Sequence, residues 1–269
     1  HGGAVQAAWQ LVDIRHSQLN TGFSQTVIEA ISTQLAEGNQ VLVFLNRRGF
    51  APTLMCHDCG WVANCRHCDA HLTVHTNRPG LHCHHCESRQ PLPAICPECS
   101  SQQLNYLGQG TERSEATLQA LFPETSVHRV DRDSTGSKHA MEELLSQINK
   151  NEPCILVGTQ MLAKGHHFPG VTLVVVLDAD TSLFSTDFRA LEKMGQLITQ
   201  VAGRAGRGAK PGVVMIQSHH CEHPVFELLS RHSYAKFAQH QLQERQFSAM
   251  PPFTNAALIR AEFHHGGEA

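Results

Sequence analysis

The sequence lacks the features that would take it into or across a membrane. Its longest apolar run, from Val171 to Leu177, is far shorter than the roughly 20 residues of a membrane-spanning helix and suits a buried strand. The first residues, His1 to Ala4, lack the charged and apolar regions of a secretory signal. The chain also begins without an initiating Met, so we expect a fragment of a longer protein.

An excess of basic charge is also absent. Charged residues make up 17% of the 269 residues, and the formal net charge is -3. A chain of this charge cannot attract nucleic acid through its overall field, so any DNA contact has to come from local groups. The hydrophobic content of 41% fits a globular chain with one large domain or two modest ones.

Cysteine, by contrast, is present and unevenly distributed. Eight of the ten cysteines form four Cys-x-x-Cys pairs, with the spacing C-x2-C-x5-C-x2-C-x14-C-x2-C-x9-C-x2-C. A secreted disulfide scaffold is usually shorter and spreads its cysteines along the whole chain. Each pair can give two thiolates to a tetrahedral ion, so two pairs close one zinc site. We therefore predict two structural zinc ions, held by Cys56, Cys59, Cys65, Cys68, Cys83, Cys86, Cys96 and Cys99.

These pairs can combine in three ways. Sequential pairing would close Cys59 to Cys65 over only five residues, which is tight. Nested pairing joins the pair at Cys65 to the pair at Cys83 across 14 residues, near the usual zinc-ribbon spacing, and we favour it. Free thiols or redox pairs are the plain alternatives, but chance clustering of eight thiols within 44 residues is improbable. Some histidines could replace a cysteine but are not needed, namely His67, His84 and His85. Cys154 and Cys221 have no partner and are interpreted as structural.

Hydrophobic periodicity predicts alternating strands and helices on both sides of the cysteine segment. The expected strands are 41–45, 127–130, 155–157, 171–177 and 213–216, and the expected helices are 26–36, 112–121, 138–149, 191–202 and 223–247. Such alternation is typical of an α/β fold with a parallel sheet covered on both faces.

The cysteine segment interrupts this alternation. A structureless loop of that length is unusual within a compact domain. The segment has few apolar residues, and metal binding can supply the folding energy that these residues do not provide. We therefore expect 51–105 to be an inserted two-zinc mini-domain that projects from the sheet. The ranges 1–50 and 106–248 would form the two parts of the sheet lobe, and 249–269 would begin a carboxyl-terminal domain.

One further stretch, Gln200 to Arg207, carries candidate chemistry for phosphate. Arg204 and Arg207 lie three residues apart on one helical face, and guanidinium groups suit developing phosphoryl charge. Taken alone, a surface helix end with solvated arginines is an equally good interpretation.

A second stretch, Gly158 to Phe168, follows a predicted buried strand, where α/β proteins bind ligands. Its small and hydroxyl side chains can take a nucleic-acid backbone, although a plain turn is the alternative. Asp178 and Asp180 end the next strand. A magnesium site is one interpretation, and capping or orienting a neighbour is the one we favour.

Together, these stretches resemble the second recombinase-like lobe of superfamily-2 helicases. Residues 41–50 resemble motif IV, residues 110–112 the short motif after it, residues 158–168 motif V, and residues 200–207 motif VI. The cysteine insert after Asn46 to Phe50, with the stretch from Gly158 to Pro169, closely resembles the primosomal protein N′ (PriA) family of bacterial helicases. The resemblance covers the chain from about Leu11 to Glu262.

The resemblance also implies roles for single residues. It implies that two arginine fingers reach the ATP phosphates with a glutamine in support, namely Arg204, Arg207 and Gln200. It implies contacts to the DNA strand or the nucleotide cleft from Thr159, Gln160, Lys164 and Gly165, of which Lys164 and Gly165 are assigned to the nucleotide. We further predict that Trp61, on the first cysteine pair, contacts nucleic acid.

The implied function is that of an ATP-dependent 3′-to-5′ DNA helicase that recognises stalled or branched forks and helps primosome assembly. The chain has no G-x-x-x-x-G-K-[ST] loop and no Asp-Glu-x-His box. Both belong to the first lobe, which would supply the rest of the ATP and Mg²⁺ site, so the fragment alone is expected to be inactive.

The implied partners are fork and single-stranded DNA, primosome proteins and single-strand-binding protein, without a membrane. A cytoplasmic, nucleoid-associated bacterial monomer is expected. The alternatives are a non-catalytic zinc-ribbon module that binds nucleic acid or protein, and another superfamily-2 motor in repair or transcription.

Overall fold

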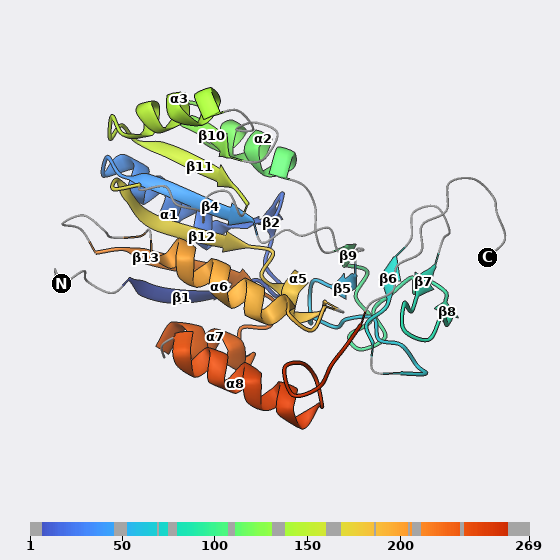
Figure 1. Cartoon of the computed structure of the whole chain (residues 1–269). Helices are drawn as coiled ribbons and strands as arrows, with labels where there is room; N and C mark the ends of the chain where they lie inside the picture. Colours follow the sequence, from blue (N-terminus) through green and yellow to red (C-terminus); the bar gives the residue numbers. More distant parts are fainter. Residues whose placement is uncertain are drawn as a thin grey trace.

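A six-stranded parallel sheet forms the centre of the structure (Figure 1). Its strand order is β1-β13-β12-β4-β11-β10, and every neighbouring pair is parallel. The strands are β1 (Ala8–Asp13), β4 (Gln40–Leu45), β10 (Ser126–Val130), β11 (Cys154–Gly158), β12 (Val171–Leu177) and β13 (Val213–Ser218). This confirms the parallel α/β fold that the alternation predicts.

The structure is a computed structural model. It describes residues 7–45, 53–68, 70–74, 80–106, 111–130, 138–159, 168–185, 187–203, 205, 211–231 and 234–257. Within these ranges, no helix is both long and apolar enough to cross a membrane.

Helices cover both faces of the sheet. They are α1 (Gln25–Ala36), α2 (Thr111–Leu121), α3 (Lys138–Ile148), the short α5 (Asp180–Leu183), α6 (Ala190–Ala202), α7 (Pro224–Arg231) and α8 (Tyr234–Phe247). One core contains buried side chains of α3, α6, α7 and α8, and the other contains those of α1 and α2. Figure 1 shows α6 in front of the sheet and α1 behind it.

The central strands are almost entirely apolar because both of their faces are covered. Every residue of β4, β11 and β12 is buried. Val41, Val43 and Leu45 point to the α1 and α2 side, and the alternate residues Leu42 and Phe44 to the other. Because the side chains on both faces enter an apolar core, these strands appear in the sequence as continuous hydrophobic runs without alternating polar residues.

The ends of α1 follow local rules. Ser24, at the N-cap, accepts a hydrogen bond from the backbone N–H of Val27. At the other end Gly38 has a φ of 77°, which lets the chain turn directly into β4. The helix therefore brings β4 in at a fixed register beside β11 and β12.

Two features differ from the sequence expectations. The edge strand β1 was not expected, because only one of its residues, Val12, is fully buried and the signal of an edge strand is weak. The predicted helix 223–247 is wrong as a single element. It forms α7 and α8, which pack against each other, because Phe226 and Phe237 both enter the same core.

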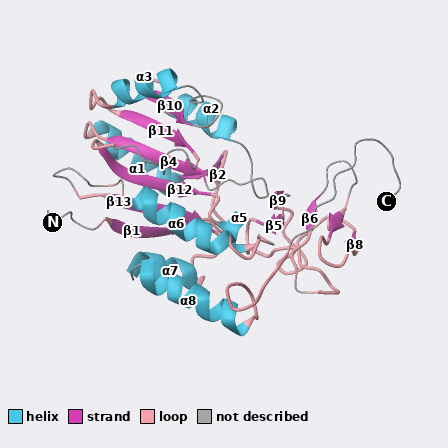
Figure 2. Ribbon diagram, in the orientation of Figure 1, coloured by secondary structure: helices cyan, strands magenta, loops and turns pink. Residues whose placement is uncertain are grey.

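The cysteine segment lies at the end of the sheet toward which the strand arrows point (Figure 1), and Figure 2 shows that it is mostly loop. Strands β5 (Leu54–Cys56) and β9 (Leu104–Tyr106) pair antiparallel and bring its two ends together. Strands β6 (Thr73–Val74), β7 (Leu81–His82) and β8 (Arg89–Gln90) form a small antiparallel sheet within it. A second two-stranded antiparallel ribbon, β2 (Leu19–Asn20) with β3 (Phe23–Ser24), precedes α1.

Candidate functional site

The eight paired cysteines gather into two groups of four. In each group, all four sulfur atoms lie within 4.8 Å of one another, and the groups are Cys56, Cys59, Cys96 and Cys99, and Cys65, Cys68, Cys83 and Cys86. The first pair joins the last and the two middle pairs join each other. This is the nested arrangement that the spacing favours.

The distances between sulfur atoms fit a tetrahedral metal ion. They are 3.6 Å for Cys56 with Cys99 and 3.5 Å for Cys68 with Cys83. Four thiolates about 2.3 Å from a zinc ion would lie roughly 3.8 Å apart. A disulfide would need about 2.05 Å, and all of these cysteines are free. The donor set therefore fits two zinc ions, each held by four thiolates.

Three of the four cysteine pairs, those that begin at Cys56, Cys83 and Cys96, are shaped by the same backbone turn. The residue after the second cysteine donates its N–H to the carbonyl of the first cysteine, as in Gly60 to Cys56 at 2.9 Å. That residue has a positive φ in three pairs, at Gly60, Glu87 and Ser100. Glycine is thus not required at this position, although a left-handed backbone is.

In the second group, the surroundings of Cys65 favour its thiolate. The Ser88 hydroxyl and the backbone N–H of His67 lie 3.1 Å and 3.4 Å from the Cys65 sulfur. Their hydrogen bonds lower the pKa of the Cys65 thiol to about 6. In the first group burial raises the pKa of Cys59 to about 12. A metal ion would have to displace protons there, so its binding depends on pH.

The apolar core of the insert is small. It contains seven buried residues, two of them cysteines, namely Leu54, Ala63, Cys65, Leu72, Val74, Leu81 and Cys83. Trp61 is half-buried and packs against this core. Its backbone carbonyl also accepts the N–H of Cys56, so Trp61 helps to build the first knuckle. The DNA contact assigned to it stays a prediction.

The two lone cysteines have ordinary surroundings. Cys154 is buried at the start of β11, and burial raises its pKa to about 11. Cys221 donates toward the Ser218 carbonyl at 3.5 Å, and burial raises its pKa to about 11 as well. Neither thiol is activated, in agreement with their interpretation as structural.

Among the predicted motor residues that the structure describes, Thr159 lies at the carboxyl edge of the sheet. Thr159 directly follows β11 and is half-buried. Gln200 is exposed in the last turn of α6. The remaining predicted residues, Gln160, Lys164, Gly165, Arg204 and Arg207, lie outside the described residues.

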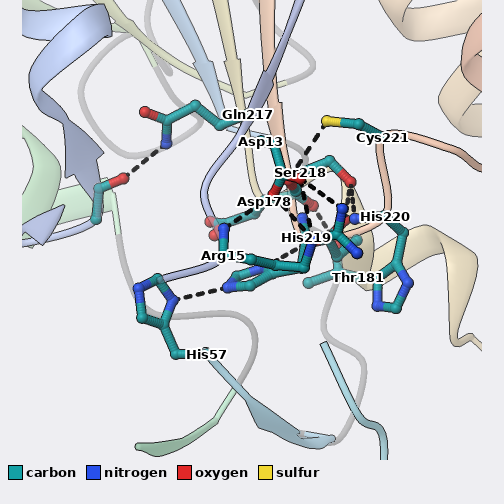
Figure 3. A network of polar contacts seen from close by, with 12 residues as sticks. Asp13, Arg15, His57, Asp178, Thr181, Gln217, Ser218, His219, His220 and Cys221 are labelled. Atoms are coloured by element: carbon teal, nitrogen blue, oxygen red, sulfur yellow. Dashed lines mark hydrogen bonds and ion pairs between the residues drawn. The ribbon is translucent and has the colours of Figure 1, made fainter. Parts of the chain in front are cut away.

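The same edge carries a polar network that the sequence did not reveal (Figure 3). The Asp180 carboxylate accepts hydrogen bonds from the Ser218 hydroxyl and from the backbone N–H of His219, and its Oδ2 lies 2.8 Å from His219 Nδ1. The far ring nitrogen of His219, Nε2, lies 2.8 Å from Nδ1 of His57, which follows the first zinc cysteine. Asp180 thus orients its neighbours, the interpretation favoured from the sequence.

Two family models match the chain, one in the lobe and one in the insert. The "Helicase conserved C-terminal domain" matches residues 100–209, and the "PriA DNA helicase Cys-rich region (CRR) domain" matches residues 65–91. The first model thus covers the second part of the lobe, and the second covers the inner group of four cysteines.

Several bacterial proteins are similar over almost the whole chain. The replication restart protein PriA of Haemophilus influenzae is 48% identical over 255 residues, which are 95% of this chain and 35% of that protein. PriA of Bacillus subtilis is 44% identical over 93% of this chain and 31% of that protein. PriA of Rickettsia conorii is 39% identical over 93% of this chain and 39% of that protein. The chain thus spans about a third of the length of these curated relatives.

Proposed function

Because the chain belongs to the family of the replication restart protein PriA, we propose that the intact protein is an ATP-dependent 3′-to-5′ DNA helicase that acts at stalled or branched replication forks. In this proposal the chain supplies the second motor lobe and the zinc domain. The observation that carries it is the pair of four-cysteine groups inserted after β4 of a parallel sheet, in a chain 48% identical to a PriA over 95% of its length.

The lobe contributes one half of the ATP site in this proposal. Phosphoryl transfer needs positive charge placed where negative charge develops, and guanidinium groups provide it. Arg204 and Arg207 take this role with Gln200 in support, and Lys164 and Gly165 border the nucleotide. The phosphate loop and the Mg²⁺ ligands come from a partner lobe outside this chain, so the chain alone hydrolyses no ATP.

The insert has a structural metal and a mechanical role in this proposal. Its eight cysteines hold two Zn²⁺ ions that fold it, and neither ion takes part in ATP hydrolysis. The DNA strand runs past Thr159 and Gln160 on the lobe and past Trp61 on the insert. Fork DNA and single-stranded DNA are the substrates, and primosome proteins and single-strand-binding protein are the partners, of a monomer in the bacterial cytoplasm at the nucleoid.

The test is an arginine substitution in the intact, zinc-loaded protein. Arg207→Ala is expected to lower DNA-stimulated ATP hydrolysis about a hundredfold or more, as arginine-finger losses do, and nucleotide affinity less. A matched control is Arg231→Ala, since Arg231 is an exposed arginine of α7 that pairs only with Glu227 of the same helix among the described ion pairs. Its turnover should stay at the wild-type level.

Near-normal turnover of Arg207→Ala would remove this residue from the ATP site. An intact protein with two zinc ions and no DNA-stimulated turnover at all would favour the alternative, a zinc module that binds nucleic acid or protein without catalysis.

A further inference from the structure

The first cysteine pair contacts the motor lobe through a histidine that holds no metal. His57 lies between Cys56 and Cys59 but belongs to neither group of sulfur atoms, and its ring points toward His219 (Figure 3). Nε2 of His57 lies 2.6 Å from the backbone carbonyl of Ser17, and Nδ1 lies 2.8 Å from Nε2 of His219. The insert is therefore joined to two separate segments of the lobe by one side chain.

His219 is in turn fixed by the lobe. It directly follows β13, and its Nδ1 faces the Asp180 carboxylate at 2.8 Å. The same carboxylate accepts the His219 backbone N–H at 3.0 Å and the Ser218 hydroxyl. Only 3% of Asp180, 6% of His219 and 8% of His57 is exposed. The three side chains form a buried line from the lobe to the insert, which we call the relay.

Donor and acceptor chemistry shows what this relay requires. The Ser17 carbonyl and the Asp180 carboxylate only accept, so the ring nitrogen that faces each of them has to donate. The two nitrogens that face each other need one proton between them. The relay is thus an unbroken line of buried hydrogen bonds from the Asp180 carboxylate to the Ser17 carbonyl.

The same cysteine pair is also held from a second side. A Cβ atom at Gly60 would lie 3.1 Å from the His220 ring and 3.3 Å from the His219 carbonyl, so the backbone of the pair sits directly against this loop. Phe184 packs edge-on against His220 at 4.8 Å and against His71 of the insert at 5.2 Å. These contacts leave the first pair little room to move on the lobe.

We propose that Asp180, His219 and His57 are positioning residues that fix the zinc insert to the carboxyl edge of the motor sheet, so that lobe movement during ATP hydrolysis is passed to the insert as DNA unwinding. The proposal rests on the helicase function proposed above. Unwinding needs a rigid element held against the duplex while the lobes move, and a loosely joined insert would move independently. ATP hydrolysis itself needs only the two lobes.

The experiment compares His57→Ala, His219→Ala and the double variant in the intact, zinc-loaded protein. Hydrogen exchange of residues 56–60 should become about tenfold faster or more in each single variant, because each removes the buried hydrogen bond between His57 and His219. The double variant should exceed the single variants little, since both remove the same link. Two zinc ions per chain should remain, because neither histidine is a ligand.

Function is measured on the same preparations. DNA-stimulated ATP hydrolysis should stay within about twofold of wild type. The number of forks unwound per ATP hydrolysed should fall about tenfold, by the same factor as hydrogen exchange at residues 56–60 rises. His57→Gln should recover part of this loss, because its amide can donate to the Ser17 carbonyl and accept from His219. His16→Ala is the matched control, since that imidazole is 74% exposed and lies 3.8 Å from Asp58 of the same cysteine pair.

Unchanged hydrogen exchange at residues 56–60 in both single variants would overturn the proposal, whatever the helicase does. Faster exchange with normal unwinding per ATP would also overturn it, because the joint would then be irrelevant to coupling. So would loss of zinc in His57→Ala and His219→Ala. A wild-type protein that unwinds no fork would instead refute the helicase function, and the exchange rates would still decide whether the relay holds the insert.

Discussion

The sheet lobe and the cysteine insert reach a folded state by different physical means. The lobe buries 22 residues in the core on one face of its sheet and 15 in the core on the other. In the described part of the insert the connected apolar core has only seven buried residues, and the strands are two or three residues long. Apolar burial of this small extent cannot offset the conformational entropy of an ordered segment of this length.

Two metal ions can make up this difference. A structural zinc site in a small peptide contributes about 10–16 kcal/mol near neutral pH, which is more than the net stability of many whole domains. The comparison teaches that one chain can contain a part that is stable by packing and a part that folds only with its metal. Each region should therefore respond to perturbations that leave the other unchanged.

The largest expected effect is that of metal removal. Chelation, or the substitution Cys83→Ser, should unfold most of the insert while the sheet lobe keeps its circular dichroism and its thermal transition. Elemental analysis should find two zinc ions before chelation, and X-ray absorption should show sulfur ligands alone. Because protons compete with zinc for the thiolates, release should become easier as the pH falls. Loss of the lobe transition together with the insert would contradict the separation of the two regions.

A substitution in the core of the lobe should destabilise the lobe and leave the insert unchanged, and its effect should be smaller than that of metal removal. A Cβ atom at Gly195 of α6 would lie 2.4 Å from the ring of Phe237 of α8, which is fully buried. Gly195→Ala should therefore lower the free energy of unfolding of the lobe by about 1–3 kcal/mol, as overpacking of a core does. Zinc content should not change. The control is Gln196→Ala at the exposed neighbouring residue. Equal melting temperatures of the two variants would show that α8 shifts to make room for the methyl group without loss of stability.

The smallest effect is expected at the surface pair of Asp13 and Arg15. The Arg15 guanidinium lies 2.5 Å from the Asp13 carboxylate and holds its pKa below the ordinary value. Both side chains are a third or more exposed, so Arg15→Ala should cost less than about 1 kcal/mol at neutral pH. A carboxyl with a lowered pKa stabilises the fold above its unfolded-state pKa and loses this contribution as the pH falls through its folded-state pKa. Urea melts of both proteins should therefore differ at pH 7 and converge in acid.

Much of the fold could be predicted where the signal is local. The run from Val171 to Leu177 is strand β12 residue for residue, because a strand covered on both faces is apolar at nearly every position. The nested arrangement of cysteines was favoured by their spacing, since a connection of five residues makes sequential sites tight, and the structure confirms it. The edge strand β1 and the separation of α7 from α8 were missed, because both depend on which distant surface covers a residue.

The relay could not be predicted from the sequence. His57 and His219 are 162 residues apart, and Asp180 is 39 residues before His219. Asp180 and His219 both follow predicted strands, and these strands are neighbours in the sheet. Local periodicity, however, does not predict the order of strands. His57 carried no signal beyond its place beside a zinc cysteine.

The sequence by itself determined the metal chemistry, the strand and helix alternation, and the family. These depend on residue type and on spacing within a few tens of residues, where chain geometry leaves few choices. Only the tertiary structure decided where the insert sits on the lobe and which polar groups meet there. The parallel strands place the residues that follow β12 and β13 at one edge, and the folding of the insert brings His57 to the same edge. Hydrogen bonds of this kind form only after the apolar cores have set the distances.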